Sequence, residues 1–172
     1  MITSQLSHKA MDTSLSINEI ILALRNCGLW NKRSDIMIPN LSWGLLQYEA
    51  DFVVVSKSGY LTEIEIKRSY SDFLADFKKD HSHDAEQVYY FYYCVPERIA
   101  QKVIDYLKEH NIDKAVLTYS EDGSINRTSY GCVSLHGKHR KLFIEEQLTI
   151  ARLGQLRFWN LLEAQYSQTD NK

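Results

Sequence analysis

The fold is decided by residues 48–67, YEADFVVVSKSGYLTEIEIK. Two runs rich in β-branched and aromatic side chains flank the polar segment SKSG. Such runs around a short segment that contains glycine predict a β-hairpin. A three-residue loop, with Gly59 in the left-handed conformation, would pair Ser56 with Tyr60 and set the register of the whole hairpin.

That register decides which polar side chains meet across the hairpin. Asp51 would lie directly opposite Glu65, and Glu49 opposite Lys67. A two-residue turn would instead shift the pairing by one residue and separate these side chains. Two facing carboxylates, with Cβ atoms about 5 Å apart, repel each other.

A hard cation between the two carboxylates explains this arrangement better than chance does. Mg²⁺ and Mn²⁺ take one or two carboxylates and complete their coordination with water and substrate phosphate. Lys67 would lie beside the ion, able to orient or deprotonate a water molecule or to meet the charge that develops on a phosphate. The sequence therefore predicts a site for Mg²⁺ or Mn²⁺ at Asp51 and Glu65.

Plainer interpretations of the same residues stay open. Glu63, Glu65 and Lys67 could form the solvent-exposed face of an edge strand. Glu63 is expected to be peripheral rather than a ligand. Glu49 could be a salt-bridge partner of Lys67 or a residue of the metal site.

The rest of the chain predicts alternating helices and strands. A helix begins after Ser16 as N-cap, with Glu19 completing a capping box, and ends at Gly28. Further elements are expected as a strand near 34–38, a strand entering at 45–48, a helix over 71–80 capped by Ser71, a buried strand at 88–95, a helix over 96–111, a strand at 114–120 and a helix over 148–165. This order favours a single α/β domain with a central mixed β-sheet flanked by helices. We expect residues 1–14 to form a flexible arm and residues 15–168 to form the domain.

Composition excludes several classes of protein. The chain has 172 residues, 44% hydrophobic and 24% charged, with a net charge of -2, which argues against a disordered tail and a polybasic binder. The chain has three cysteines, Cys27, Cys94 and Cys132, and no CxxC pair. This argues against a disulfide framework and against a thiolate zinc site, and it favours a reducing compartment. Without an apolar signal region or a run of about 18 apolar residues, the chain is expected to be cytoplasmic.

The spacing around the hairpin resembles the PD-(D/E)XK nuclease superfamily, whose fold is called restriction-endonuclease-like. Asp51 is followed, after thirteen residues, by Glu65-Ile66-Lys67. Residues 63–80, EIEIKRSYSDFLADFKKD, are similar to the EIKxSxxDFxxDxK pattern of its MmcB-like, DNA-repair-associated branch. The chain departs from the family at Ala50, where a proline is common, and from the branch at Arg68 and His81.

The resemblance, which covers residues 49–95, implies a set of roles. Asp51 and Glu65 would hold Mg²⁺ or Mn²⁺ together with the carbonyl oxygen of Ile66, and Lys67 would be catalytic. We further expect supporting roles for Glu19, Glu49, Asp72 and Asp76, and contacts with nucleic acid for Arg68, Lys78 and Lys79.

These features predict a metal-dependent nuclease that hydrolyses DNA phosphodiester bonds, in DNA repair or in mobile-element biology. The alternative is a non-catalytic module that keeps the fold to bind nucleic acid or protein, and the modest acidity favours it. An RNA substrate also stays open, because the active-site chemistry is shared. A homodimer could form through the helix that carries Leu156, Phe158 and Trp159.

Three other segments suggest a zinc site, a phosphate contact and base stacking, but their patterns support these functions only weakly. His81, His83 and Asp84 suggest zinc, but the spacing offers no further soft ligand. The basic run at 136–141 is more commonly a charged loop than a phosphate contact. The tyrosine-rich strand at 88–93 favours core packing over base stacking, although tyrosine on both of its faces suggests that one face lines a groove.

Overall fold

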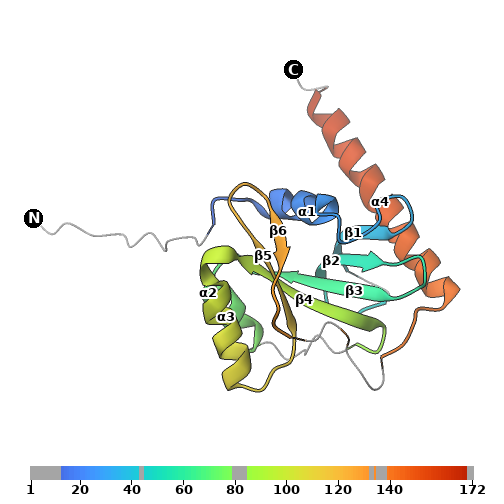
Figure 1. Ribbon diagram of the computed structural model, residues 1–172. Coiled ribbons are helices and arrows are strands. Elements are labelled where there is room, and N and C mark those ends of the chain that lie inside the picture. Colours follow the sequence, from blue (N-terminus) through green and yellow to red (C-terminus); the bar gives the residue numbers. More distant parts are fainter. Residues whose placement is uncertain (1–12, 43–44, 79–84, 132–133, 135–138, 170–172) are drawn as a thin grey trace, which may run out of the picture.

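Figure 1 shows the computed structural model, which describes residues 13–42, 45–78, 85–131, 134 and 139–169. These residues form a single α/β domain around a six-stranded sheet of order β1-β2-β3-β4-β5-β6. β3, β4 and β5 run parallel to one another, whereas the other neighbouring strands are antiparallel. The sheet is therefore mixed, and the predicted fold class is confirmed. The elements in chain order are α1 (Ile17–Asn26), β1 (Ile36–Leu41), β2 (Ala50–Val55), β3 (Leu61–Ile66), α2 (Tyr70–Asp76), β4 (Val88–Pro96), α3 (Glu97–Glu109), β5 (Ala115–Tyr119), β6 (Ile125–Arg127) and α4 (Ile144–Thr169).

Helices cover both faces of the sheet (Figure 1). In β2, Phe52 and Val54 pack against α1, whereas Val53 and Val55 belong to the apolar cluster that includes Ile150 of α4. Alternate residues of a strand point to opposite faces, so α1 and α4 cover opposite faces. Helices α2 and α3 pack on β4 and β5, on the same face as α4.

The predicted hairpin and its register are confirmed. Gly59 has a φ of +85°, and its N–H donates to the Ser56 carbonyl at 2.8 Å. The N–H of Ser56 in turn donates to the Tyr60 carbonyl at 2.9 Å, as expected for a three-residue loop. The pairing continues along both strands, with Phe52 opposite Ile64. Glycine at this one position lets the chain take the left-handed conformation without strain.

The second helix begins earlier than predicted. Ser69, not Ser71, is the N-cap of α2, because its backbone is extended and its hydroxyl accepts the N–H of Asp72 at 3.1 Å. The Asp72 carboxylate accepts the N–H of Arg68, the residue before the N-cap, at 3.1 Å. The helix also ends at Asp76, well before residue 80.

The outer parts of the sheet differ most from the prediction. The first strand spans Ile36–Leu41 rather than 34–38, and residues 45–48 form no strand. No pattern in the sequence indicated β6, a three-residue edge strand that pairs with β5. Such a short segment has too few residues for its alternation to be recognised.

Helix α4 begins at Ile144 rather than at residue 148, and it continues through Gly154. A Cβ added to Gly154 would lie 2.8 Å from Cδ1 of Ile38, so glycine allows the helix to pack closely on β1. Although α4 has 26 residues, no helix in the described ranges is both long and apolar enough to cross a membrane.

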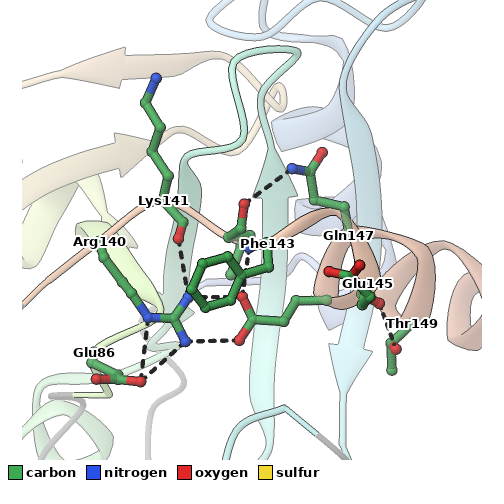
Figure 2. Close-up of polar contacts among 9 residues, drawn as sticks. Glu86, Arg140, Lys141, Phe143, Glu145, Gln147 and Thr149 are labelled. Atoms are coloured by element: carbon green, nitrogen blue, oxygen red, sulfur yellow. Dashed lines mark hydrogen bonds and ion pairs between the residues drawn. The ribbon is translucent and has the colours of Figure 1, made fainter.

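An ion-pair clasp anchors the start of α4 (Figure 2). The Arg140 guanidinium donates to Glu86 at 3.0 Å and to both carboxylate oxygens of Glu146 at 2.8 Å. The Phe143 N–H also donates to Glu146, at 2.7 Å. The hydrogen bonds from Arg140 lower the pKa of the Glu146 carboxyl. The clasp therefore ties the first turn of α4 to the segment that enters β4.

The packed part of the chain includes residues just before the predicted domain boundary. Thr13 is buried, and the N–H of Ser14 donates to Glu121 at 3.1 Å. These two residues thus belong with the domain, while residues 1–12 of the predicted arm lie outside the described part of the chain.

Candidate active site

The site is built on β3, the third strand of the sheet. Glu63, Glu65 and Lys67 are 0%, 4% and 2% exposed. β3 lies between β2 and β4, so it is a central strand with a neighbour on each side. The interpretation of these residues as a solvent-exposed edge is therefore wrong.

Lys67 lies between two buried carboxylates. Its Nζ donates to Glu65 Oε1 at 2.7 Å and to Asp76 Oδ1 at 2.8 Å. The three side chains are 3%, 5% and 2% exposed. The hydroxyl of Tyr93 donates to the other oxygen of Asp76 at 3.2 Å, and burial followed by the charge of Asp76 raises the pKa of Tyr93. Charged groups this well buried need such pairing, because an unpaired ion would cost several kcal/mol.

The backbone of Lys67 is held as firmly as its side chain. Its N–H donates to the carbonyl of Cys94 in β4 at 2.9 Å. Its carbonyl accepts the hydroxyl of Tyr119, from β5, at 3.2 Å. Three elements besides β3 therefore fix this residue: α2 through Asp76, β4 through Cys94 and β5 through Tyr119.

Asp51 lies on the adjoining strand at the position that the hairpin register predicts. One of its carboxylate oxygens accepts the N–H of Ile66 at 2.8 Å. The side chain is half-buried, in contrast to the buried Glu65. The paired part of β2 and β3 ends with Phe52 opposite Ile64, and Asp51 and Glu65 are the next residues on the two strands. The structure thus brings together Asp51, Glu65, Ile66 and Lys67.

Glu63 belongs to the same face of the sheet, and it is fully buried there. Its carboxylate accepts the hydroxyl of Tyr48 at 2.7 Å. Burial, followed by the charge of Glu63, raises the pKa of Tyr48. The strict alternation of β3 already places Glu63 on the face of Glu65, so this signal was available in the sequence. The contact with Tyr48, which precedes β2, could not be predicted from this alternation.

The polar side chains form a strip between two apolar clusters on one face of the sheet. The strip consists of Asp51, Glu63, Glu65, Lys67 and Asp76. One cluster joins α4 to β1 and β2 and contains Ile38, Val53 and Ile150. The other joins α2 and α3 to β4 and β5 and contains Phe73 and Val116. The strip is therefore enclosed by apolar packing on two sides, which strengthens the electrostatic interactions within it.

Two of the expected supporting acids, Glu19 and Asp72, bind backbone N–H groups at the starts of helices. Glu19 accepts the N–H of Ser16 at 2.7 Å, and this capping lowers the pKa of its carboxyl. α1 lies on the face opposite the strip, so the structure does not bring Glu19 to the site. Asp72 lies in the first turn of α2, where its carboxylate accepts the N–H of Arg68. Glu49 is exposed, and the described carboxylate partners of Lys67 are Glu65 and Asp76 instead.

The residues expected to contact nucleic acid lie in different environments. Arg68, next to the strip, is half-buried, and its Nε is buried without a hydrogen-bond partner among the described residues. Lys78, just past the end of α2, is exposed. Lys79 lies outside the described residues, as does the segment with His81, His83 and Asp84.

The strip has hard oxygen donors of the kind that bind a divalent cation. Among the described residues, no group of three or more His, Cys, Asp or Glu side chains could hold a metal ion. The expected ligand set is smaller: the carboxylates of Asp51 and Glu65 on facing strands, completed by a backbone carbonyl. One or two carboxylates with water and substrate phosphate suffice for Mg²⁺ or Mn²⁺. The residues present fit such an ion.

The two described cysteines, Cys27 and Cys94, are free thiols. Burial raises the pKa of both, which disfavours the reactive thiolate form. Cys132 and residues 136–138 of the basic run lie outside the described residues. In the tyrosine-rich strand β4, Phe91 and Tyr93 are buried, as core packing predicts, whereas Tyr90 and Tyr92 are half-buried.

Comparisons with known proteins place only the fold. No family model matches the chain, and no curated protein matches it. Among solved structures, the chain is similar to the SPO1766 protein of unknown function from Silicibacter pomeroyi, with a TM-score of 0.54 and 13% identity over 80% of this chain and 84% of that one. A similarity at this identity extends to the arrangement of helices and strands.

Proposed function

We propose that the protein is a metal-dependent nuclease that hydrolyses DNA phosphodiester bonds. One observation carries the proposal: the Asp51 carboxylate accepts the N–H of Ile66, the residue between Glu65 and Lys67, and the Lys67 ammonium is 2.7 Å from Glu65. Two acids and a lysine, enclosed by apolar packing, match the needs of phosphodiester hydrolysis. The reaction requires a cation, a positioned water molecule and a fixed positive charge.

In this proposal, Asp51 and Glu65, with the carbonyl oxygen of Ile66, would hold Mg²⁺ or Mn²⁺. The bound ion would supply Lewis acidity toward a phosphate oxygen and increase the acidity of a coordinated water molecule. Lys67 would place its positive charge against the phosphate. Asp76 would be a positioning residue, because it holds the Lys67 ammonium at 2.8 Å and is itself held by Tyr93.

The family resemblance stated above and the restriction-endonuclease-like topology are part of the same proposal, as is a role in DNA repair or mobile-element biology. A DNA substrate also agrees with the expected cytoplasmic location. Of the expected DNA contacts, Arg68 directly follows Lys67 in the chain, and its Nε is buried without a described partner.

A second candidate function is a non-catalytic binding module on the same fold. The observation that favours it is the enclosure of Lys67, which is 2% exposed and bonded to two carboxylates. An ion network of this kind can serve stability and fold specificity alone.

The test is cleavage of labelled single-stranded and double-stranded DNA, and of RNA, with Mg²⁺ or Mn²⁺ titrated from zero. Glu65→Gln and Lys67→Met are the test variants, and Glu109→Gln, on the exposed surface of α3, is the matched control. Circular dichroism of each variant checks that it is folded. Binding of the same oligonucleotides is measured separately by fluorescence anisotropy in Ca²⁺.

The proposal predicts metal-dependent cleavage that falls by at least about 100-fold in both test variants and stays unchanged in the control. Preferential cleavage of RNA would support the proposed active site but would show that the substrate is RNA rather than DNA. Binding without cleavage by the wild-type protein at any metal concentration would refute the nuclease proposal and support the binding module.

A further inference from the structure

Helix α4 is apolar on more than the side that it buries. Its inward side packs on β1 through Ile150, which is buried, and through Gly154, which lies against Ile38. Yet Leu156 and Trp159 are 58% and 49% exposed on the same helix. A helix that is apolar on two sides is usually covered on both.

The exposed residues form an ordered stripe. Arg152, Leu156, Trp159 and Glu163 follow one another at intervals of four, three and four residues, and all four are exposed. Residues at this spacing lie on one side of an α-helix. At about 100° per residue, that side is opposite the one that carries Ile150 and Gly154. Figure 1 shows the C-terminal part of α4 extending past the sheet.

The stripe is complementary to itself when it is turned around. It has a basic residue at one end, an acidic residue at the other and two apolar residues between them. In an antiparallel pair of such helices, Arg152 of each copy would meet Glu163 of the other, and Leu156 would meet Trp159. The small apolar side chain thereby faces the large one, and both charge pairs are of opposite sign.

We infer that the outer stripe of α4, formed by Arg152, Leu156, Trp159 and Glu163, binds a second copy of this chain in an antiparallel, two-fold symmetric dimer. The charge complementarity selects this occupant, because a two-fold axis through the middle of the stripe satisfies both ends at once. The aromatic and leucine side chains would supply the apolar centre of the contact, and the charges its rim. The clasp of Arg140 with Glu86 and Glu146 fixes the start of the helix, so the stripe is presented on an anchored element. The inference is independent of the proposed reaction.

The test is sedimentation equilibrium of the full chain over a range of concentrations. The wild-type protein is expected to dimerise reversibly. Arg152→Glu alone and Glu163→Arg alone should each weaken the dimer by about tenfold or more, because each places two like-charge pairs in the interface. The control variant is Lys57→Glu, on an exposed residue of the hairpin loop. It changes the charge as Arg152→Glu does and should leave association unchanged.

The decisive measurement mixes the two impaired variants. In the mixed dimer, the new acidic side chain of the Arg152→Glu variant would meet the new basic side chain of the Glu163→Arg variant. The second contact would keep its native pair, so both contacts are attractive and the mixture should associate about as tightly as the wild type. The double variant Arg152→Glu/Glu163→Arg should also dimerise about as tightly as the wild type, because both of its charge pairs are again of opposite sign. This recovery cannot result from misfolding of either variant.

Two results would overturn the inference. One is a wild-type chain that stays monomeric at the highest concentration. The other is a dimer that neither single reversal affects, which would place the contact elsewhere on the chain.

Discussion

Lys67→Met is the substitution whose effect on stability the structure predicts most sharply. The change keeps an unbranched side chain of similar length but removes the ammonium that lies 2.7 Å from Glu65 and 2.8 Å from Asp76. Both buried carboxylates then lose the ammonium group that pairs with them. Removing one partner of a buried ion pair costs about 3–5 kcal/mol, so the free energy of unfolding should fall by about that amount.

The companion variants follow from the same geometry. Asp76→Asn leaves Lys67 its bond to Glu65 and keeps an acceptor for Tyr93, so it should cost less, about 1–3 kcal/mol. In the double variant Lys67→Met/Asp76→Asn, only one carboxylate, that of Glu65, loses the Lys67 ammonium, rather than two. Its loss should therefore be smaller than the sum of the single losses, by at least about 1 kcal/mol.

The measurement is urea unfolding at neutral pH, followed by circular dichroism, with Lys57→Met in the exposed hairpin loop as the matched control. A Lys67→Met variant within about 1 kcal/mol of the wild type at the same denaturant slope would refute the described network. Strict additivity of the single variants would do the same, because it would mean that Lys67 and Asp76 do not interact.

Three further predictions concern the fold around the site. Gly131→Ala should unfold or strongly destabilise the protein in thermal melts, because Gly131 has a φ of +80° and an added Cβ would overlap the backbone carbonyl of Lys114. Tyr48→Phe leaves the buried carboxylate of Glu63 without the 2.7 Å hydrogen bond, and chemical denaturation should show a loss of about 1–3 kcal/mol. Glu146→Gln should lower stability by about 1 kcal/mol at neutral pH. Arg140 lowers the folded-state pKa of Glu146 below 4.5, so its contribution is present above pH 4.5 and is lost as the pH falls through that lower value. Melts of wild type and Glu146→Gln should therefore converge in acid, and a gap that persists there contradicts the assignment.

Several features of the candidate site followed from short-range patterns. The register of β2 against β3 depends on the three-residue loop at Gly59, which lies within a few residues of both strands. The alternation of β3 likewise places Glu63, Glu65 and Lys67 on one face. The capping box of Glu19 is a contact over three residues, and it was predictable for the same reason.

Other features depended on contacts between distant parts of the chain. Position in the sheet made β3 central rather than an edge, and this position is set by the parallel pairing with β4. The alternation within a strand is identical in both cases, so no local pattern distinguishes a buried glutamate from an exposed one. The sequence also did not indicate which face of the sheet α1 covers. It therefore could not show that Glu19 lies away from the strip.

The sequence by itself thus determined the hairpin, its register and the set of charged residues that share one face, because these depend on interactions between residues near one another in the chain. Only the tertiary structure decided that these charges are buried and how they are neutralised. Lys67 receives its second carboxylate from α2, and Tyr93 of β4 secures that carboxylate in turn. The reason is physical: burial and pairing of a charge are properties of everything that packs around it, and most of those neighbours come from other elements of the fold.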